Sequence, residues 1–321
     1  MKQVEHLLGY RESIKVMDAT LRDGGLVNDF YFTDDFVKAL YKTNLEAGVD
    51  YMEMGYRASK KVFDETKFGK WKFCSDDHIR KIVGENDTNL KLAIMADIGR
   101  HDKNDFDEKV NSPVDMVRVA AYIHQMPEAI DMIEDAHKKG YETTCNIMAI
   151  SQTQESDLKV ALDMLGKTPV DTIYIVDSFG SIYPEEMKRI VDIYMEAATK
   201  YGKQLGVHAH NNQQLAFANT IEACGDGVNW LDATYKGMGR GAGNCAMELL
   251  LGFLKNPKYN TYPVFRFISD YMVKLEEDGV VWGYDLQYLM TGQLNQHPRT
   301  AIKFTKDKRK DYAEFYKELI V

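Results

Sequence analysis

The chain has 321 residues, 45% hydrophobic and 28% charged, which is a globular composition with enough apolar mass for a large core. The formal net charge is −9 and only the run 306–310 is rich in Lys and Arg, so we expect no nucleic-acid partner. No apolar stretch approaches the ~20 residues that span a membrane, and residues 1–13 lack the layout of a signal peptide.

Short apolar runs alternate along the chain with longer amphipathic runs. The first amphipathic run begins at Thr33, whose hydroxyl can cap a helix, and ends at Gly48. Further helices are predicted at 125–139 and 154–166, and another begins at Pro184. The apolar runs are typical of buried parallel strands. We predict strands at 14–20, 49–55, 90–98, 114–122, 141–150, 170–178, 203–210 and 227–235.

The number of strand–helix units determines the predicted fold. Eight units within residues 1–255 favour a closed (β/α)8 barrel, an α/β TIM barrel, over an open doubly wound sheet, which is the structural alternative. Residues 256–321 lie outside the repeat and are expected to form a short helical extension packed on the barrel. The polar stretch 55–75 is too long for a plain connection and predicts a lid or a rim insertion. In the extension we expect helices at 263–278, 284–291 and 309–319.

Unusual polar residues gather at the carboxyl ends of the predicted strands, where barrel enzymes hold their catalytic groups. His208 and His210 are two positions apart on one strand, so both imidazoles point to the same side. Asp23 follows the first strand, only two strands away around an eight-stranded ring. Two imidazoles and one carboxylate suit a first-row divalent ion, so we predict that these residues bind one metal ion. Two structural histidines at a strand end are the alternative.

Charged and glycine residues surround this predicted site. Arg22 precedes Asp23, and its planar guanidinium can hold a carboxylate or a developing enolate oxygen. It can also form an ion pair with Glu53, at the end of the second strand, and the two roles are compatible. Gly24 and Gly25 either leave backbone N–H groups free for an anionic substrate or form a tight turn.

A Gly-rich segment, 237–244, follows the eighth strand. A loop of this kind at the start of a helix can hold an anion, although its spacing is neither a Walker loop nor a Rossmann fingerprint. Asn244 in this segment could reach the metal or its water. Lys236 could instead form a Schiff base with a carbonyl substrate, but a metal that stabilises an enolate makes one unnecessary.

Three motifs together resemble a known family: D-A-T-L-R-D-G-G (18–25), H-A-H-N-N (208–212) and G-M-G-R-G-A-G-N (237–244). They are similar to the TIM-barrel metallolyase superfamily named for its Asp-Arg-Glu triad. That superfamily includes hydroxymethylglutaryl-CoA lyase, isopropylmalate synthase and 4-hydroxy-2-oxovalerate aldolase. The resemblance covers residues 14–255, and the segment 207–251 looks most like the aldolase.

The resemblance implies a role for each matching residue of the triad and the metal site. Asp23 would be the carboxylate ligand, and His208 and His210 the paired imidazole ligands. Arg22 would stabilise the enolate, and Glu53 would be the triad glutamate.

Other residues match positions around that centre. The resemblance implies that Ser178 contacts the substrate, that Asn244 lies at the metal and that Asp18 supports the site from behind. We expect the same supporting role for Asn212. The family often uses Mn²⁺ or Mg²⁺, and Zn²⁺ in some relatives. We expect Mn²⁺, with Mg²⁺, Co²⁺ or Zn²⁺ as alternatives.

Two departures from the aldolase pattern concern the proton and the partner. The aldolases carry a histidine, thought to be a general base, where this chain has Leu26. Tyr284 roughly matches an aldolase tyrosine and could move the proton, and a water activated by the metal is the alternative. The aldolases also have a long C-terminal domain that docks a dehydrogenase. The tail here is shorter and different, so we predict no dehydrogenase partner.

Together, the motifs and the resemblance predict a metal-dependent carbon–carbon lyase of class II aldolase type. It would act on a small-molecule 2-oxo acid such as pyruvate and on an aldehyde, through a metal-stabilised enolate. The alternatives are an acyl-CoA-dependent Claisen-type synthase or lyase, and a non-catalytic metal-binding barrel. The sequence leaves open whether copies form a homo-oligomer. We expect a cytoplasmic protein whose separated cysteines are reduced and buried, namely Cys74, Cys145, Cys224 and Cys245.

Overall fold

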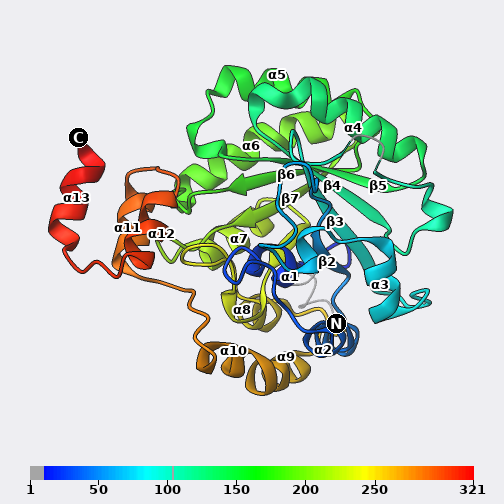
Figure 1. Cartoon of the computed structure of the whole chain (residues 1–321). Helices are drawn as coiled ribbons and strands as arrows, with labels where there is room; N and C mark the ends of the chain where they lie inside the picture. The colour runs from blue at the N-terminus through cyan, green and yellow to red at the C-terminus, as the bar shows by residue number, and fades with distance from the viewer. Residues whose placement is uncertain (1–10, 103–104) are drawn as a thin grey trace.

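Eight parallel strands close into a barrel in the computed structural model, which describes residues 11–102 and 105–321 (Figure 1). Each strand pairs with the next along the chain, and β8 pairs with β1 to close the ring. The predicted closed barrel and its eight strands are confirmed, and the open-sheet alternative is wrong. The expectation that residues 1–13 are not a signal peptide concerns mostly residues 1–10, which lie outside the described residues. The strands are β1 (Lys15–Asp18), β2 (Tyr51–Tyr56), β3 (Lys91–Asp97), β4 (Met116–Ala121), β5 (Glu142–Ile147), β6 (Thr172–Asp177), β7 (Gln204–Ala209) and β8 (Trp230–Ala233).

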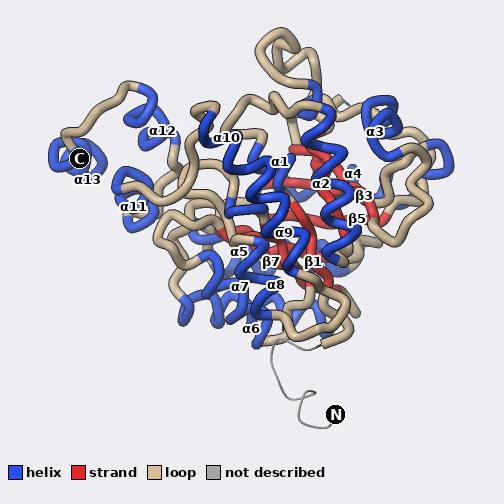
Figure 2. Tube along the Cα trace, turned by 90° about the horizontal axis from the view of Figure 1, so that it is seen from below, coloured by secondary structure: helices blue, strands red, loops and turns tan. Residues whose placement is uncertain are grey.

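Helices surround the strands on the outside of the barrel (Figure 2). Local sequence sets their ends: the Thr33 hydroxyl accepts a hydrogen bond from the Phe36 N–H at 3.2 Å, and Gly48 ends that helix with a φ of 74°. Pro184 begins the helix after β6, as predicted. The outer helices are α2 (Asp34–Ala47), α3 (Asp76–Val83), α4 (Met126–Lys138), α5 (Glu155–Gly166), α6 (Pro184–Tyr201), α7 (Ala216–Gly225) and α8 (Met247–Phe253). The short, fully buried α1 (Thr20–Gly24) directly follows β1.

Large side chains fill one layer of the barrel interior. They form a hydrophobic cluster that is separate from the main core, which lies between the strands and the surrounding helices. Because side chains alternate along a strand, the residue two positions further on points inward as well. Three buried charged residues stand at that next level: Glu53 after Tyr51, Arg118 after Met116, and Asp232 after Trp230. The strand period therefore places ionised groups inside the barrel.

The C-terminal helices fall into two groups (Figure 1). The first group packs against α2 and extends the main hydrophobic core beyond residue 255, and the second has its own small apolar cluster. The division into a barrel at 1–255 and an extension at 256–321 stays a proposal. The helix between the last two predicted ones was missed. The C-terminal elements are α9 (Thr261–Phe267), η6 (Ile268–Met272), α10 (Val273–Glu277), α11 (Leu286–Gln293), α12 (Arg299–Lys306) and α13 (Tyr312–Ile320).

The stretch 55–75 is a packed insertion at the barrel rim. Arg57 and Phe73 pair in an antiparallel bridge that brings its ends together, and the short η1 helix (Lys70–Lys72) buries Trp71 completely. The remaining short 3₁₀ helices are η2 (Lys109–Asn111), η3 (Ile123–Gln125), η4 (Ile150–Gln152) and η5 (Tyr235–Gly237).

Two composition-based expectations concern the membrane and the cysteines. Among the described residues, no helix combines the length and apolar character needed to cross a membrane. All four cysteines are buried and form no disulfide, as expected.

Candidate metal centre

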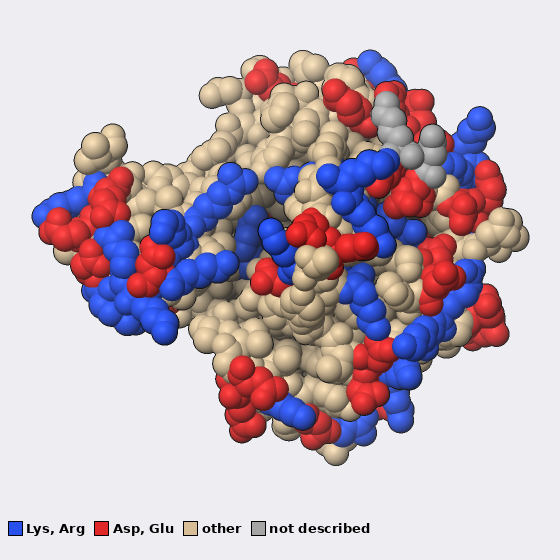
Figure 3. All heavy atoms as spheres, in the orientation of Figure 1, with Lys and Arg blue, Asp and Glu red and all other residues tan. Residues whose placement is uncertain are grey.

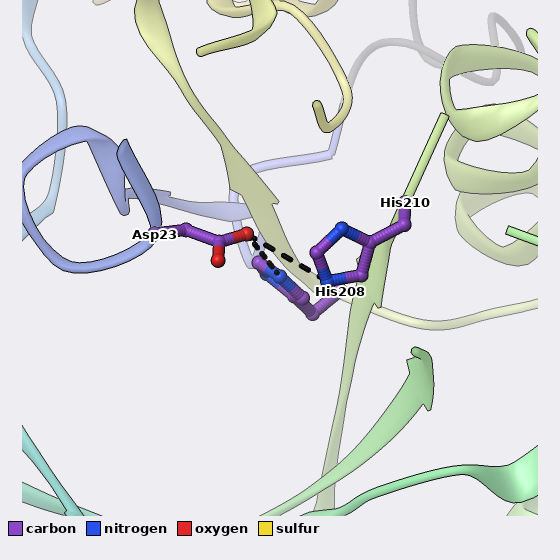
Figure 4. A group of neighbouring side chains, drawn as sticks. All are labelled: Asp23, His208 and His210. Atoms are coloured by element: carbon purple, nitrogen blue, oxygen red, sulfur yellow. Dashed lines mark ion pairs between the residues drawn. The ribbon is translucent and has the colours of Figure 1, made fainter. Parts of the chain in front are cut away.

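Asp23, His208 and His210 converge at the carboxyl end of the barrel (Figure 4). Asp23 lies in α1, His208 lies in β7, and His210 follows that strand directly. The Oδ2 atom of Asp23 is 3.3 Å from Nε2 of His208 and 3.7 Å from Nε2 of His210. All three side chains are buried, and their potential ligand atoms lie within 4.8 Å of one another. The cluster can therefore hold a metal ion.

The local fold of α1 holds Asp23 in place. Its N–H donates to the Ala19 carbonyl at 2.9 Å, so the helix begins directly where β1 ends. A Cβ on Gly24 would lie 2.9 Å from the Met238 sulfur, and a Cβ on Gly25 would lie 2.2 Å from the Phe30 ring. The two glycines thus allow close packing around α1. The Gly25 N–H donates within the helix, so it is not free for a substrate.

Asp232 fixes the orientation and tautomer of the His208 ring. Its Oδ2 lies 3.0 Å from Nδ1 of His208, so Nδ1 carries the proton and donates to the carboxylate. The lone pair on Nε2 is then directed at Asp23 and is available to a cation. Asp232 is itself held by Arg118, whose Nη2 donates to the same oxygen at 2.6 Å.

Arg118 connects that pair to a second buried ion pair. The Nε of Arg22 donates to Oε2 of Glu53 at 2.8 Å, and Nη1 of Arg118 lies 3.0 Å from the same oxygen. The predicted pairing of Arg22 with Glu53 is present, whereas Arg118 and Asp232 were not predicted from the sequence. Each is a charged residue inside an otherwise apolar strand. Because a buried charge requires a partner, this pattern could have indicated a buried ion pair.

The charges in this network shift the ionisation of the predicted ligands. Burial alone raises the pKa of Asp23, but the positive charge of the neighbouring Arg22 holds the pKa well below its usual value. Burial and the neighbouring Arg240 lower the pKa of His210 well below its usual value. The carboxylate is therefore ionised and the His210 ring is neutral, which are the forms that bind a metal ion.

Unpaired polar atoms test whether this site suits a cation. Both carboxylate oxygens of Asp23, Nε2 of His208 and the amide oxygen of Asn244 are buried without a hydrogen-bond donor. Such atoms are costly to bury unless something binds them. A Cβ on Gly239 would lie 2.3 Å from Nδ2 of Asn244 and 3.2 Å from Oδ2 of Asp23, so only glycine leaves this space open. The residues fit a divalent ion.

A cavity opens in front of the cluster. Ser178 lines it, and its Oγ accepts a hydrogen bond from the Ala149 N–H at 2.8 Å, while its contact with a substrate stays a prediction. Leu26 and Tyr56 also line it, so an apolar side chain stands where the aldolases carry a histidine. The complete lining is Arg22, Asp23, Leu26, Tyr56, Met95, Ala120, Asn146, Met148, Val176, Ser178, His208, His210 and Arg240.

Several residues considered from sequence lie outside that lining, among them Tyr284, Lys236, Asp18 and Asn212. Tyr284 is 46% exposed, and Lys236 forms an ion pair with Glu276, so neither side chain faces the metal cluster in this structure. Asp18 accepts a hydrogen bond from Asn44 of α2 at 2.7 Å, and burial raises its pKa to about 6. It supports the turn from β1 into α1. Asn212 is buried beside Gly180 and Gly292, and its supporting role stays a prediction.

Comparison with known proteins identifies the family. A family model described as HMGL-like matches residues 13–267. The chain belongs to the HMGL-like family. An oxaloacetate decarboxylase of Mycobacterium tuberculosis is 29% identical over 248 residues, covering 77% of this chain and 71% of the relative. A 4-hydroxy-2-oxovalerate aldolase of Thermus thermophilus is 29% identical over 247 residues, covering 76% and 70%.

Solved structures agree with this assignment. The N-terminal domain of a candidate aldolase from Bacteroides vulgatus superposes with a TM-score of 0.75 at 28% identity, covering 91% of this chain and 97% of that one. The HMG-CoA lyase of Bacillus subtilis superposes with a TM-score of 0.66 at 15% identity, covering 84% and 95%. The second likeness concerns the fold alone.

Proposed function

We propose that this HMGL-like protein is a divalent-metal-dependent carbon–carbon lyase that acts on a 2-oxo acid such as pyruvate and on an aldehyde. The observation that carries the proposal is the His208 ring, whose proton is held by Asp232 while its free Nε2 faces Asp23 at the base of a cavity. The names of two relatives support it, because 4-hydroxy-2-oxovalerate and oxaloacetate are both 2-oxo acids.

Asp23, His208 and His210 would hold the ion, with Asn244 beside them. When bound, a divalent ion supplies Lewis acidity to a keto oxygen, which favours formation of an enolate. We propose Mn²⁺, and Mg²⁺, Co²⁺ and Zn²⁺ suit the same donor set.

Arg22 provides the second positive charge of the site. Its Nε is engaged by Glu53 and its Nη1 lies 3.3 Å from Oδ1 of Asp23, so the guanidinium cannot rotate freely. Arg22 also lines the cavity, where its N–H groups would share the negative charge that develops on the oxygen of a 2-oxo acid. A donor fixed in advance costs little reorganisation during the reaction.

The cavity walls and a tyrosine would control water and the proton. Leu26 and Met95 give the cavity apolar sides, which reduce the access of water to an enolate. Tyr56 lines the same cavity and is the tyrosine placed to exchange a proton with a substrate there. The proposed role of Tyr284 would require its exposed side chain to move toward the cavity.

A metal-supplemented screen tests the proposal. Purified protein with Mn²⁺, Mg²⁺, Co²⁺ or Zn²⁺ is mixed with 4-hydroxy-2-oxo acids and oxaloacetate, and pyruvate release is followed with lactate dehydrogenase. We expect turnover that chelator abolishes and that Asp23→Ala and His208→Ala lack, with metal content measured in parallel. The exposed His137→Ala is the control that keeps both.

Three results would contradict it. Normal metal content in Asp23→Ala and His208→Ala would show that the ion binds elsewhere. A borohydride-trapped substrate adduct on Lys236 would indicate a Schiff-base mechanism instead. Turnover of acyl-CoA substrates without turnover of any 2-oxo acid would favour the Claisen-type alternative.

A further inference from the structure

Arg240 is an arginine of the cavity without an acidic partner. Arg22 and Arg118 each contact two carboxylates, whereas no carboxylate in the described part of the chain pairs with Arg240. Its Nη2 donates to the Ser178 carbonyl at 3.0 Å, and its buried Nε has no acceptor. The Ser178 contact orients the guanidinium at the cavity but leaves its charge unpaired.

His297 adds a second donor beside it. Its Nδ1 accepts a hydrogen bond from the Arg299 N–H at 3.1 Å, so in the neutral ring the proton resides on Nε2. Burial and the positive charge of Arg240 lower the pKa of His297 to about 3, which keeps the ring neutral. Nε2 lies 3.4 Å from Nη1 of Arg240. Two donors thus stand side by side without an acceptor between them.

Hydrogen bonds and ring packing hold the C-terminal segment around His297 against the barrel. Asn295 connects two rim loops, since its Oδ1 accepts hydrogen bonds from Ser151 at 2.7 Å and Ser181 at 2.9 Å. The Phe179 ring packs edge-on against His297 with centroids 5.8 Å apart. Figure 3 shows Lys and Arg side chains around the hollow where the C-terminal helices meet the barrel. Arg240, which lines the cavity, and His297 beside it are therefore held in fixed positions.

The charges of the site indicate what this pair would bind. Arg22 and Arg118, with the carboxylates of Asp23, Glu53 and Asp232, leave one negative charge. A bound divalent ion would change the net charge of these groups from one negative to one positive, and the carboxylate of a 2-oxo acid would balance it. The charge of Arg240 remains, so a substrate with a single carboxylate leaves it uncompensated in a largely buried site.

We propose that Arg240 and His297 bind a second anionic group of the substrate, on the fragment beyond the bond that breaks. The substrate class would then be 2-oxo acids with a distal carboxylate or phosphate, as opposed to those with an uncharged end. This inference rests on the proposed lyase function of the same cavity and names the substrate class within it.

Matched substrates test the proposal. 4-Hydroxy-2-oxopentanoate and 4-hydroxy-2-oxoglutarate differ only in a terminal methyl or carboxylate, and 4,5-dihydroxy-2-oxopentanoate 5-phosphate tests a phosphate. We expect the wild type to prefer an anionic end in kcat/KM. Arg240→Ala should lose about 10²-fold more in kcat/KM on the preferred anionic substrate than on the methyl one, mainly through KM. Arg240→Lys should restore part of the preference, because it keeps the charge but not the planar fork.

If Arg240 has only a structural role, Arg240→Ala would lower kcat/KM for the anionic and the methyl substrate equally and leave the ratio of the two values unchanged. That result would overturn the proposal, as would a wild type that prefers the methyl substrate. Arg309→Ala is the control, because Arg309 forms ion pairs with Asp311 and Glu318 within the C-terminal segment. Circular dichroism and urea midpoints check that each variant is folded.

Measurements of ligand binding test the anion site independently of the lyase function on which the inference rests. If no 4-hydroxy-2-oxo acid is cleaved, the lyase proposal fails, and calorimetry of the Mn²⁺-treated protein with pyruvate and 2-oxoglutarate then decides. Tighter binding of 2-oxoglutarate that Arg240→Ala abolishes supports the anion site. Equal binding of the two ligands, or a preference unchanged in Arg240→Ala, overturns it.

Discussion

Nδ1 of His208 lies 3.0 Å from Oδ2 of Asp232, and both side chains are buried inside the barrel. Burial alone would raise the pKa of Asp232, but Arg118 and the His208 hydrogen bond lower it, so the carboxylate is ionised and accepts the imidazole proton. The contact therefore determines which ring nitrogen is free to bind a metal.

Asp232→Asn should weaken metal binding while leaving the ligands in place. The amide can donate to Nδ1, which would favour the tautomer with its proton on Nε2, and the negative charge near the ring is lost. We expect metal affinity to fall by about 10- to 100-fold, the usual effect of losing such a support. Titration with Mn²⁺ followed by paramagnetic resonance measures it. Unchanged affinity would mean that Asp232 only neutralises Arg118.

Arg22→Lys should lower kcat by about 10²-fold or more, the usual effect of losing an oxyanion-type donor. Lysine keeps the charge but cannot contact Glu53 and a substrate oxygen through one planar group. Steady-state kinetics on the best substrate measures the effect, with Arg189→Lys, in a surface pair with Glu155, as control. A rate near wild type would assign Arg22 a structural role only.

Arg118→Met should destabilise the fold by about 3–5 kcal/mol, because it leaves Glu53 and Asp232 buried with one positive partner fewer each. The free energy of unfolding from urea titration measures this change. Arg189→Met removes a surface pair and should cost less than about 1 kcal/mol. Equal costs for both variants would show that the buried network contributes no more than a surface contact.

Stability should fall as pH rises through the range in which Asp177 ionises in the folded protein. Burial raises the Asp177 pKa from 3.8 to about 7, so between these values the folded state binds more protons than the unfolded state. The free energy of unfolding then decreases by about 1.4 kcal/mol per pH unit from this group. Asp177→Asn should remove that slope, and the exposed Asp87→Asn should not. Parallel pH profiles for Asp177→Asn and the wild type would contradict the assignment.

Two tyrosine variants separate the candidates for the proton. Tyr56 lines the cavity, whereas Tyr284 is 46% exposed outside it. We expect Tyr56→Phe to lower kcat by about 10²-fold, the typical contribution of acid–base catalysis, with metal content unchanged. Tyr284→Phe should keep kcat within about threefold of wild type, since surface changes rarely alter the site. The opposite order would restore Tyr284 as the proton carrier.

Sequence alone determined the barrel and the three residues of the candidate metal site. Strand and helix periodicities are local, and the repeat of eight units leaves few topologies open. His208 and His210 share a strand face for the same local reason, and Asp23 follows from the position of a strand end.

Only the tertiary structure decided what surrounds those residues. Arg118 and Asp232 are 114 residues apart, and they form an ion pair only because the closed ring directs both side chains inward at one level. The donor pair of Arg240 and His297 depends on a C-terminal segment docked on distant rim loops. Contacts of this kind depend on packing between segments far apart in the chain, which no local pattern in the sequence encodes.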